Sequence, residues 1–333
     1  MKKRNSRNHF LMAAAAILFL CLFFNTDTQA ARLPALRVKG TKLVTTSGKT
    51  VRLKGVSTHG LSWYPEYVNQ KAFTDMKKKW HVNTVRLAMY TAEYNGYCTG
   101  GKANRTALEK KVQAGIDYAT KAGMYVIVDW HILSDGNPRK YEKQSIQFFR
   151  KIAKKNRNKT NVIYEICNEP NGNVSWKTIR TYAKKMIKVI RAYDKDAVIL
   201  VGTPTWSQDV DAAAKSPIKG YKNIMYSLHF YAGTHGSWLR QKAQNALDKG
   251  LPLFVSEFAI CDASGNGKLN TTEGARWMKF LRKNKISCVA WNLSNKNESS
   301  ALLKSSSKKT SGWSSSHLTK WGRWLVKEYK KSN

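Results

Sequence analysis

The segment Ala197–Gly202 reads AVILVG, six residues without a polar side chain. A strand with one face in water alternates apolar and polar residues, so an unbroken apolar run is typical of a parallel strand that is buried on both faces. The chain contains eight short runs that are mainly apolar in this way. In chain order they are Val51–Val56, Val82–Ala88, Met124–Trp130, Val162–Asn168, Ala197–Gly202, Asn223–Phe230, Leu251–Glu257 and Ile286–Asn292.

Polar loops and longer stretches with the periodicity of a helix separate these runs. Eight buried strands that alternate with helices over about 250 residues predict an α/β fold, the (β/α)8 barrel. An open, doubly wound sheet is the alternative. It is disfavoured because no glycine-rich phosphate loop follows the first run. Polar and aromatic residues also recur at the ends of many runs, and a barrel gathers all its strand ends around one site.

Short segments flank the predicted barrel. Leu36–Leu53 alternates as two short strands around Thr46–Lys49, which predicts a β-hairpin that covers one end of the barrel. Residues 299–316 are rich in Ser and Lys and predict a long loop, and Trp321–Tyr329 predicts a last amphipathic helix. We therefore expect residues 31–333 to form a single barrel domain.

The first 30 residues have the pattern of a secretory signal peptide. Lys2, Lys3, Arg4 and Arg7 precede an apolar run over residues 10–24, and Thr28–Ala30 offers a cleavage site. The apolar run is short for a membrane span, although an uncleaved anchor is the alternative. The pattern predicts that residues 1–30 are removed and that the protein is secreted.

The chain is strongly basic. Its formal charge is +37, and removal of residues 1–30, which hold four Lys/Arg and one Asp, leaves +34. Such a field attracts acidic cell-wall polymers, anionic membranes or nucleic acids. The lysines are nevertheless dispersed in pairs and triplets such as Lys77–Lys79 and Lys154–Lys155, which favours a solvated shell. Because no nucleic-acid motif accompanies the charge, we expect no nucleic-acid partner.

Of the five cysteines, Cys21 lies in the signal segment. Cys167 and Cys288 lie inside apolar runs and are expected to be small buried hydrophobes. Cys98 and Cys261 lie in loops, so a bridge between them and the redox state of all four stay open. The Cys and His spacings fit no zinc pattern, so we expect no metal and no cofactor.

Two glutamates stand at the ends of predicted strands. Glu169 directly follows Val162–Asn168, and Glu257 ends Leu251–Glu257. Carboxyl groups at the ends of barrel strands face one another across the site, and two of them about 5 Å apart perform glycoside hydrolysis with retention. Taken singly, either glutamate could instead be a structural partner of a basic residue.

The motif set resembles glycoside hydrolase family 5, and within it the bacterial endo-β-1,4-glucanase (cellulase) branch. The two central motifs are Asn168-Glu169-Pro170 after a hydrophobic strand and Val255-Ser256-Glu257-Phe258 later. Others stand at further strand ends, and together they cover residues 40–330. They are His59–Trp63, Val85–Tyr90, Asp129–Leu133, Gly202–Gln208, His229–His235 and Trp291–Leu293.

This resemblance implies an internal cut in a β-1,4-glucan such as cellulose, with Glu169 as general acid/base and Glu257 as nucleophile. Arg86 and Tyr231 would hold Glu257, and His229 would support Glu169. Substrate would contact the remaining site residues, which are aromatic, amide, imidazole and charged side chains. They are His59, Trp63, His131, Asn168, Trp206, Trp291, Lys296 and Glu298.

Several alternatives remain beside this assignment. Another activity of the same family, on mannan, xyloglucan or mixed-linkage glucan, would keep the same catalytic pair. A non-catalytic carbohydrate-binding protein on the same fold would not need it. Asp129 is expected to be a structural hydrogen-bond acceptor, His131 and His229 could be metal ligands, and the protein is expected to be a monomer.

Overall fold

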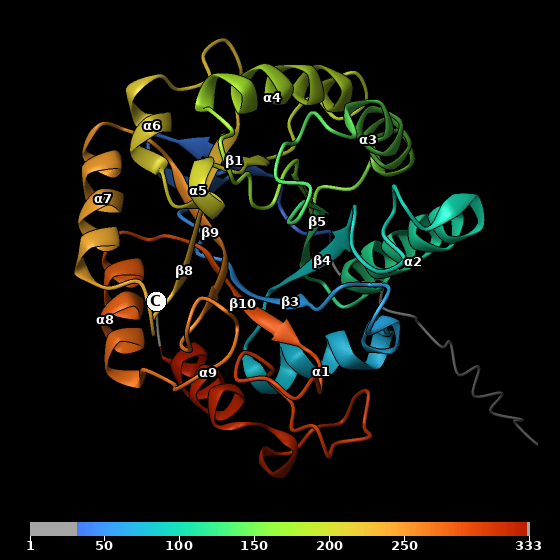
Figure 1. The fold of residues 1–333 in the computed structure, drawn as a ribbon, viewed down its shortest axis with the longest axis vertical. Coiled ribbons are helices and arrows are strands. Elements are labelled where there is room, and N and C mark those ends of the chain that lie inside the picture. The colour runs from blue at the N-terminus through green and yellow to red at the C-terminus, as the bar shows by residue number, and fades with distance from the viewer. Residues whose placement is uncertain (1–31, 332–333) are drawn as a thin grey trace, which may run out of the picture.

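The computed structural model describes residues 32–331, and its centre is a closed barrel of eight parallel strands (Figure 1). The strands pair in the order β10-β3-β4-β5-β6-β7-β8-β9, which confirms the predicted (β/α)8 fold. The signal-peptide prediction falls outside the described residues. The barrel strands are β3 (Lys54–Thr58), β4 (Thr84–Tyr90), β5 (Tyr125–His131), β6 (Val162–Glu165), β7 (Ile199–Val201), β8 (Ile224–Tyr231), β9 (Leu253–Ala259) and β10 (Cys288–Leu293).

All eight strands overlap the predicted apolar runs, but most of the runs begin one to three residues before the strand. The first run, for example, starts at Val51, whereas β3 starts at Lys54. The reason is that apolar residues before a strand, such as Leu53, are buried in a second hydrophobic cluster at the amino ends of the strands. A residue buried at the end of the barrel and a residue buried in a strand are both apolar, so the sequence alone does not tell them apart.

The helices form a ring around the strands (Figure 1). Their apolar faces are buried against the barrel, as in α4, where Ser175 caps the first turn and residues such as Ile179, Tyr182 and Met186 are buried. The helices are α1 (Gln70–Trp80), α2 (Gly101–Lys121), α3 (Glu142–Asn156), α4 (Trp176–Arg191), α5 (Pro204–Ser207), α6 (Val210–Lys215), α7 (Ser237–Asp248), α8 (Thr271–Lys283) and α9 (Lys320–Lys330), with 3₁₀ turns at Pro65–Tyr67 and Ser315–His317.

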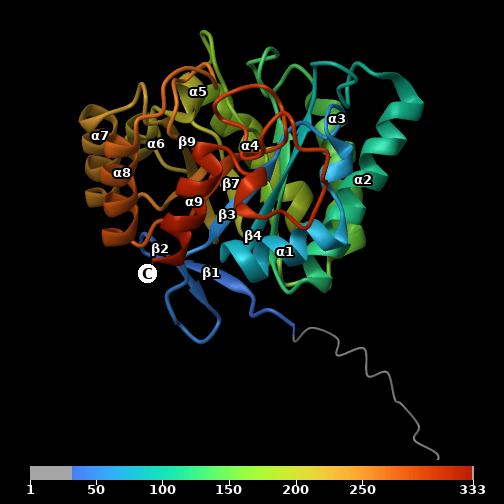
Figure 2. The ribbon, with the colours of Figure 1, turned by 90° about the horizontal axis from the view of Figure 1, so that it is seen from below.

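A hairpin of β1 (Leu36–Lys39) and β2 (Lys42–Thr45) lies across the amino end of the barrel, opposite the end that carries α5 (Figure 2). The hairpin is where the sequence predicts it, but the predicted turn is wrong. The strands reverse at Gly40–Thr41, where Gly40 has a φ of +57°. Thr46–Lys49 forms a second turn that returns the chain to an isolated bridge between Val44 and Thr50.

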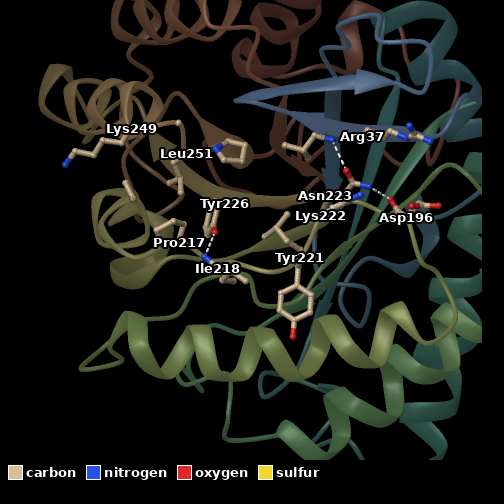
Figure 3. Close-up of a pocket in the computed structure, with 15 residues that line it drawn as sticks. Arg37, Asp196, Pro217, Ile218, Tyr221, Lys222, Asn223, Tyr226, Lys249 and Leu251 are labelled. Carbon is tan, nitrogen blue, oxygen red and sulfur yellow. Dashed lines mark hydrogen bonds between the residues drawn. The ribbon is translucent and has the colours of Figure 1, made fainter.

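Beside the hairpin, the amino end holds a cavity of about 500 Å³ between β1, α6 and the starts of β8 and β9 (Figure 3). Asn223 fastens the hairpin there: its side chain accepts a hydrogen bond from Val38 N and donates one to Asp196 O (Figure 3). Of the residues that line this cavity, only Asp196 is acidic. Its other charged lining residues are the basic Arg37, Lys222 and Lys249.

The segment after β10 closes the structure. As predicted, residues 299–316 are mostly loop and the last helix is α9, whose Tyr329 hydroxyl donates to Gly55 O on β3. Cys98, Cys167, Cys261 and Cys288 are all free thiols, so the Cys98–Cys261 bridge does not form. Within residues 32–331, no helix is long and apolar enough to cross a membrane.

Candidate active site

A cavity of about 500 Å³ opens at the carboxyl end of the barrel. Ten of the thirteen site residues predicted from the sequence line it, and they come from seven strand ends. The other three are Arg86 and Asn168, which are completely buried, and Trp63, as described next. The lining residues are His59, Tyr90, His131, Leu133, Glu169, Trp206, Gln208, His229, Tyr231, His235, Glu257, Ala263, Ser264, Gly265, Trp291, Lys296 and Glu298.

Arg86 on β4 forms the floor of the site and is completely buried. Its guanidinium contacts three carboxylates: Glu165 at 2.7 Å, Asp129 at 3.0 Å and Glu257 at 3.1 Å. It also donates to Asn168 Oδ1 at 2.5 Å. A buried cation is tolerated only when it is paired, and these anions, against the effect of burial, raise the pKa of Arg86 above its ordinary value. The Arg86 side chain therefore stays positively charged.

Glu257 on β9 lies directly above this charge. Its Oε2 faces Arg86, and its Oε1 accepts a 2.7 Å hydrogen bond from the Tyr231 hydroxyl at the end of β8. Burial and then the Glu257 charge raise the pKa of Tyr231, so the phenol keeps its proton and remains a donor. Both oxygens of Glu257 are thus held by hydrogen-bond donors, one of which is a cation.

Glu169, four residues beyond the end of the short strand β6, is held by a different partner. His229 Nδ1 lies 2.8 Å from Glu169 Oε1, and His229 Nε2 lies 2.9 Å from Ser256 Oγ. Ser256 Oγ in turn donates to Glu165 Oε1 at 2.6 Å. Burial alone would lower the pKa of His229, but its carboxylate partners Glu165 and Glu169 raise it to about 9. The imidazole is therefore protonated at neutral pH and donates from both nitrogens.

The two strand-end glutamates are close together. Glu169, His229 and Glu257 each present one atom that lies within 4.8 Å of the others. A carboxylate separation of this size fits retaining glycosidases, whose carboxyl groups are about 5 to 5.5 Å apart, and not inverting ones at about 6.5 to 9.5 Å. The same three atoms could in principle surround a cation, but each already has a protein hydrogen-bond partner.

His131 and His59 line the opposite wall as neutral imidazoles. Burial, followed by the Arg86 charge, lowers the pKa of His131 to about 3, and burial lowers that of His59 to about 4. His131 Nδ1 lies 2.6 Å from Asp129 Oδ2. Asp129 therefore accepts hydrogen bonds from within the protein, as the sequence predicted.

Asn168 joins the floor to this wall. Its Oδ1 accepts from Arg86, and its Nδ2 donates to Ile132 O at 3.1 Å and lies 3.3 Å from His131 Nε2. The amide is fully buried beneath the cavity and is fixed on both sides. Its orientation is therefore determined by the protein.

Aromatic rings continue the wall. Trp291 at the end of β10 stacks on His131, with ring centroids 5.3 Å apart and planes 13° apart. Trp63 does not line the cavity itself but packs edge-on against Tyr90 at 4.8 Å and faces Tyr94 at 5.8 Å. The predicted platform at Trp63 thus lies outside the central cavity, at one end of the aromatic wall.

Lys296 and Glu298 lie in the loop that follows β10 and form an ion pair of 2.5 Å. Asn292 Nδ2 donates to Glu298 Oε1 at 3.0 Å, which fixes the carboxylate at the cavity rim. Burial would raise the pKa of Glu298, but the hydrogen bond from Lys296 and further donors lower it. The pair presents a cation and an anion to the same space.

Trp206 lies on the other side of the cavity, and its side chain is 45% exposed. It sits in α5, where Thr205, Trp206 and Ser207 all have φ between +52° and +58°. A residue other than glycine is strained when its backbone adopts a positive φ. Three such residues in succession persist only where contacts with the surrounding structure fix that backbone. Trp206 N donates to Pro170 O, and Ser207 Oγ donates to Asn168 O, so the turn is tied to the segment around Glu169.

Sequence reasoning missed some residues of this site. The most important is Glu165, which is fully buried and contacts Arg86, Ser256 and Ser227. Burial would raise the pKa of Glu165, but the Arg86 charge lowers it to about 2. A carboxylate inside an otherwise apolar strand signals a buried cation, and that signal points to Arg86. Tyr90 and His235 stood in the quoted motifs without a role.

Comparisons with known proteins agree with this geometry. The family model described as cellulase (glycosyl hydrolase family 5) matches residues 44–297. The chain is 45% identical to endoglucanase A of Butyrivibrio fibrisolvens over 292 residues, which are 87% of this chain and 67% of the relative. It is also 45% identical to an endoglucanase of Clostridium saccharobutylicum over 97% of this chain and 72% of that one.

Solved structures give the same result. The catalytic domain of Thermobifida fusca endoglucanase Cel5A is 34% identical, with a TM-score of 0.84 over 89% of this chain and 97% of that domain. A variant of that domain, solved in complex with cellotetraose, has a TM-score of 0.83 with this chain.

Proposed function

Because this chain belongs to the cellulases of glycosyl hydrolase family 5, we propose that it is a retaining endo-β-1,4-glucanase with Glu257 as nucleophile and Glu169 as general acid/base. The observation that carries this assignment is the 4.8 Å limit on the separation of the two glutamates. At that separation a carboxylate can attack the anomeric carbon directly, whereas a water molecule would not fit between the two.

In the first step, Glu257 attacks the anomeric carbon while Glu169 gives its proton to the departing glycosidic oxygen. The carbon–oxygen bond to the leaving sugar breaks, and an ester bond to Glu257 forms. In the second step, Glu169 takes a proton from water, whose oxygen attacks the same carbon and releases Glu257. Two inversions restore the β configuration, and no cofactor takes part.

The two glutamates differ in their surroundings, which supports their different roles. Glu257 faces the fixed cation Arg86 and the phenol Tyr231, which is what an ionised nucleophile requires. Glu169 faces His229 instead, an imidazole whose pKa its carboxylate partners raise to about 9. The charge beside Glu169 therefore changes with pH in the alkaline range, whereas the charge beside Glu257 does not.

The positions of the other cavity residues suggest how each would contact the substrate. Trp291 would stack under the sugar at the cleavage point, since the apolar face of a glucose ring packs on an aromatic ring. Asn168 and the neutral imidazoles His131 and His59 offer hydrogen bonds to sugar hydroxyls beside it. Lys296, Glu298 and Trp63 extend this side, and Trp206 begins the other side.

The wider setting of the enzyme is part of the proposal. Cellotetraose bound to the T. fusca relative supports β-1,4-glucan as the substrate. We further propose that the protein is secreted, acts as a monomer, has no nucleic-acid partner and uses its charge of +34 after signal removal to associate with acidic cell-wall polymers. Such association would weaken steeply with added salt.

The test is reducing-sugar release by the purified mature protein from carboxymethylcellulose, barley β-glucan and glucomannan, beside Glu169→Gln and Glu257→Gln. We expect release from the glucans that both substitutions abolish, and ¹H NMR of the first product should show the β anomer. Activity confined to glucomannan would move the assignment to a mannanase. Wild-type inactivity on all three, or active Gln variants, would overturn it.

A further inference from the structure

Exposed apolar side chains that are scattered singly over a protein are ordinary, but those that gather at one place point to a binding surface. Among residues 32–331, three are exposed, and all three lie beyond the carboxyl ends of barrel strands: Tyr94 at 61%, Trp206 at 45% and Trp238 at 50%. Tyr94 continues the wall of Trp63. Trp206 lines the cavity. Trp238, in the first turn of α7, has no role in the mechanism above.

Trp238 lies next to the cavity lining. Its ring meets the ring of His235 edge-on, with centroids 5.8 Å apart. His235 lines the cavity and is held rigidly, because its Nδ1 accepts from Tyr231 N and its backbone oxygen accepts from Trp277 Nε1. Trp238 therefore extends the cavity surface outward from a fixed point beside Tyr231.

A chain of contacts joins Trp238 to Trp206. The Lys242 ammonium lies 5.8 Å from the Trp238 ring centroid and 2.7 Å from Asp209 Oδ1. Asp209 Oδ2 accepts a 2.6 Å hydrogen bond from Thr205 Oγ1, beside Trp206. We call Trp206, Asp209, Trp238 and Lys242 the α5–α7 ledge. It consists of two exposed indoles with an ion pair between them.

The ledge belongs to one side of the cleavage point. The general acid must stand at the leaving group, and Glu169 follows β6, whose neighbours in the barrel lead through β7 to β8. Trp206 follows β7 and Trp238 follows β8. Across the barrel, His59 follows β3, Trp291 lies in β10 and Lys296 follows β10. The ledge therefore lies on the leaving-group side.

We propose that Trp238 and Lys242 form a distal binding subsite for the leaving-group portion of a β-1,4-glucan chain, beyond Trp206. The indole face takes a glucose ring, and the ion pair of Lys242 with Asp209 offers donors and acceptors to its hydroxyls. This inference rests on the proposed function. It implies that the enzyme gains rate on long chains from a contact that short substrates never reach.

The experiment compares two substrates of the same enzyme. p-Nitrophenyl β-cellobioside has a small leaving group that does not extend to the ledge, whereas cellohexaose does. For Trp238→Ala we expect kcat/KM on cellohexaose to fall about fivefold, which is about 1 kcal/mol, with no change on the chromogenic substrate. Trp238→Phe should recover most of the loss, and Lys242→Met should lose about twofold on cellohexaose alone.

Tyr221→Ala is the matched control, since Tyr221 is a partly exposed aromatic residue at the amino-end cavity (Figure 3). It should change neither activity. An unchanged kcat/KM of Trp238→Ala on cellohexaose, or equal losses on both substrates, would overturn the subsite. A wild-type protein that cleaves neither substrate would instead overturn the proposed function, so the two failures are distinguishable.

Discussion

The two ends of the barrel carry cavities of the same size, about 500 Å³ each, yet they differ in which ionisable side chains line them. The cavity at the carboxyl end meets Glu169, Glu257 and four imidazoles, above a floor of buried charge. The cavity at the amino end meets Asp196 as its only acid and is bounded by the hairpin (Figure 3). Volume therefore does not identify the site, whereas convergent strand ends do.

The difference follows from the direction of the strands. Parallel strands send all their carboxyl ends to one face, so loops from every strand can contribute a functional side chain there. At the other face the chain must enter each strand, and residues such as Leu53, Phe254 and Val289 are buried under Leu36 and Leu43 of the hairpin. Buried charged side chains therefore interact at the carboxyl end, whereas apolar side chains of the strands and the hairpin pack together at the amino end.

The largest expected effect comes from making the same chemical change at both ends. Glu257→Gln should lower kcat on carboxymethylcellulose by on the order of 10⁴-fold or more, because the nucleophile loses its charge. Asp196→Asn should leave kcat within about twofold, since Asp196 is exposed and distant from the chemistry. Steady-state rates of the two variants measure this directly. A large loss in Asp196→Asn would break the comparison.

The next effect concerns the floor of the carboxyl end. Glu165→Gln leaves part of the Arg86 charge uncompensated, so the free energy of unfolding should fall by about 3 kcal/mol. The variant should also shift the pH–rate profile, because Glu165 reaches His229 through Ser256. Urea unfolding and the pH dependence of kcat/KM measure the two effects.

A surface carboxylate supplies the control for this variant. Glu142 pairs with Lys185 on the outside of the ring of helices, so Glu142→Gln should change stability by less than about 1 kcal/mol and should not move the pH–rate profile. If Glu165→Gln behaved like Glu142→Gln, the buried network would have no role in positioning the catalytic groups.

A substitution at the amino end of the barrel should change the stability of the protein and leave its activity unchanged. Leu43 is 1% exposed in the hairpin, and Leu43→Ala should lower the free energy of unfolding by about 2 to 3 kcal/mol through the cavity that it leaves. At a temperature well below the melting transition, kcat should be unchanged. A kcat that fell in parallel with stability would mean that the hairpin transmits strain to the cleft.

The smallest effect is a pH dependence that only the carboxyl end should have. The pKa of His229, about 9 in the folded protein, exceeds its ordinary value near 6.5. Its contribution to stability is therefore complete below pH 6.5 and disappears as the pH rises through 9. Between pH 7 and pH 9 the loss amounts to at most about 2 kcal/mol.

Chemical denaturation of the wild type and His229→Gln across this range gives the measurement, because other titrating groups cancel in the difference. The stability difference between the two proteins should shrink toward pH 9. The deficit of Leu43→Ala should stay constant over the same range. A His229→Gln difference that did not depend on pH would show that the imidazole is not charged in the folded protein.

How much of this molecule could be predicted differs between the two ends. The eight apolar runs predict the barrel, and the strand-end motifs predict the residues of the cleft, because both are local patterns. The hairpin turn was misplaced to Thr46–Lys49, since two turns follow one another there and Gly40 carries the weaker signal. No short segment of the sequence predicts the register between neighbouring strands.

The parts of the site that could not be predicted depend on contacts between distant strands. Glu165 lies 79 residues from Arg86 along the chain, and only the closed barrel brings the two to 2.7 Å. Trp238 resembles any helical tryptophan in the sequence, and its 50% exposure depends on what covers it. Residue types can be read locally, but charge compensation and exposure are properties of the assembled fold.

The arrangement around Arg86 has a consequence for the reaction intermediate. When Glu257 becomes an ester, its negative charge disappears, and an arginine with one partner would be left as an isolated buried cation. Here Asp129 and Glu165 remain in contact with the guanidinium at 3.0 and 2.7 Å. Arg86 therefore keeps carboxylate partners whether Glu257 is a free carboxylate or an ester. Formation of the ester therefore does not require Arg86 to find a new partner.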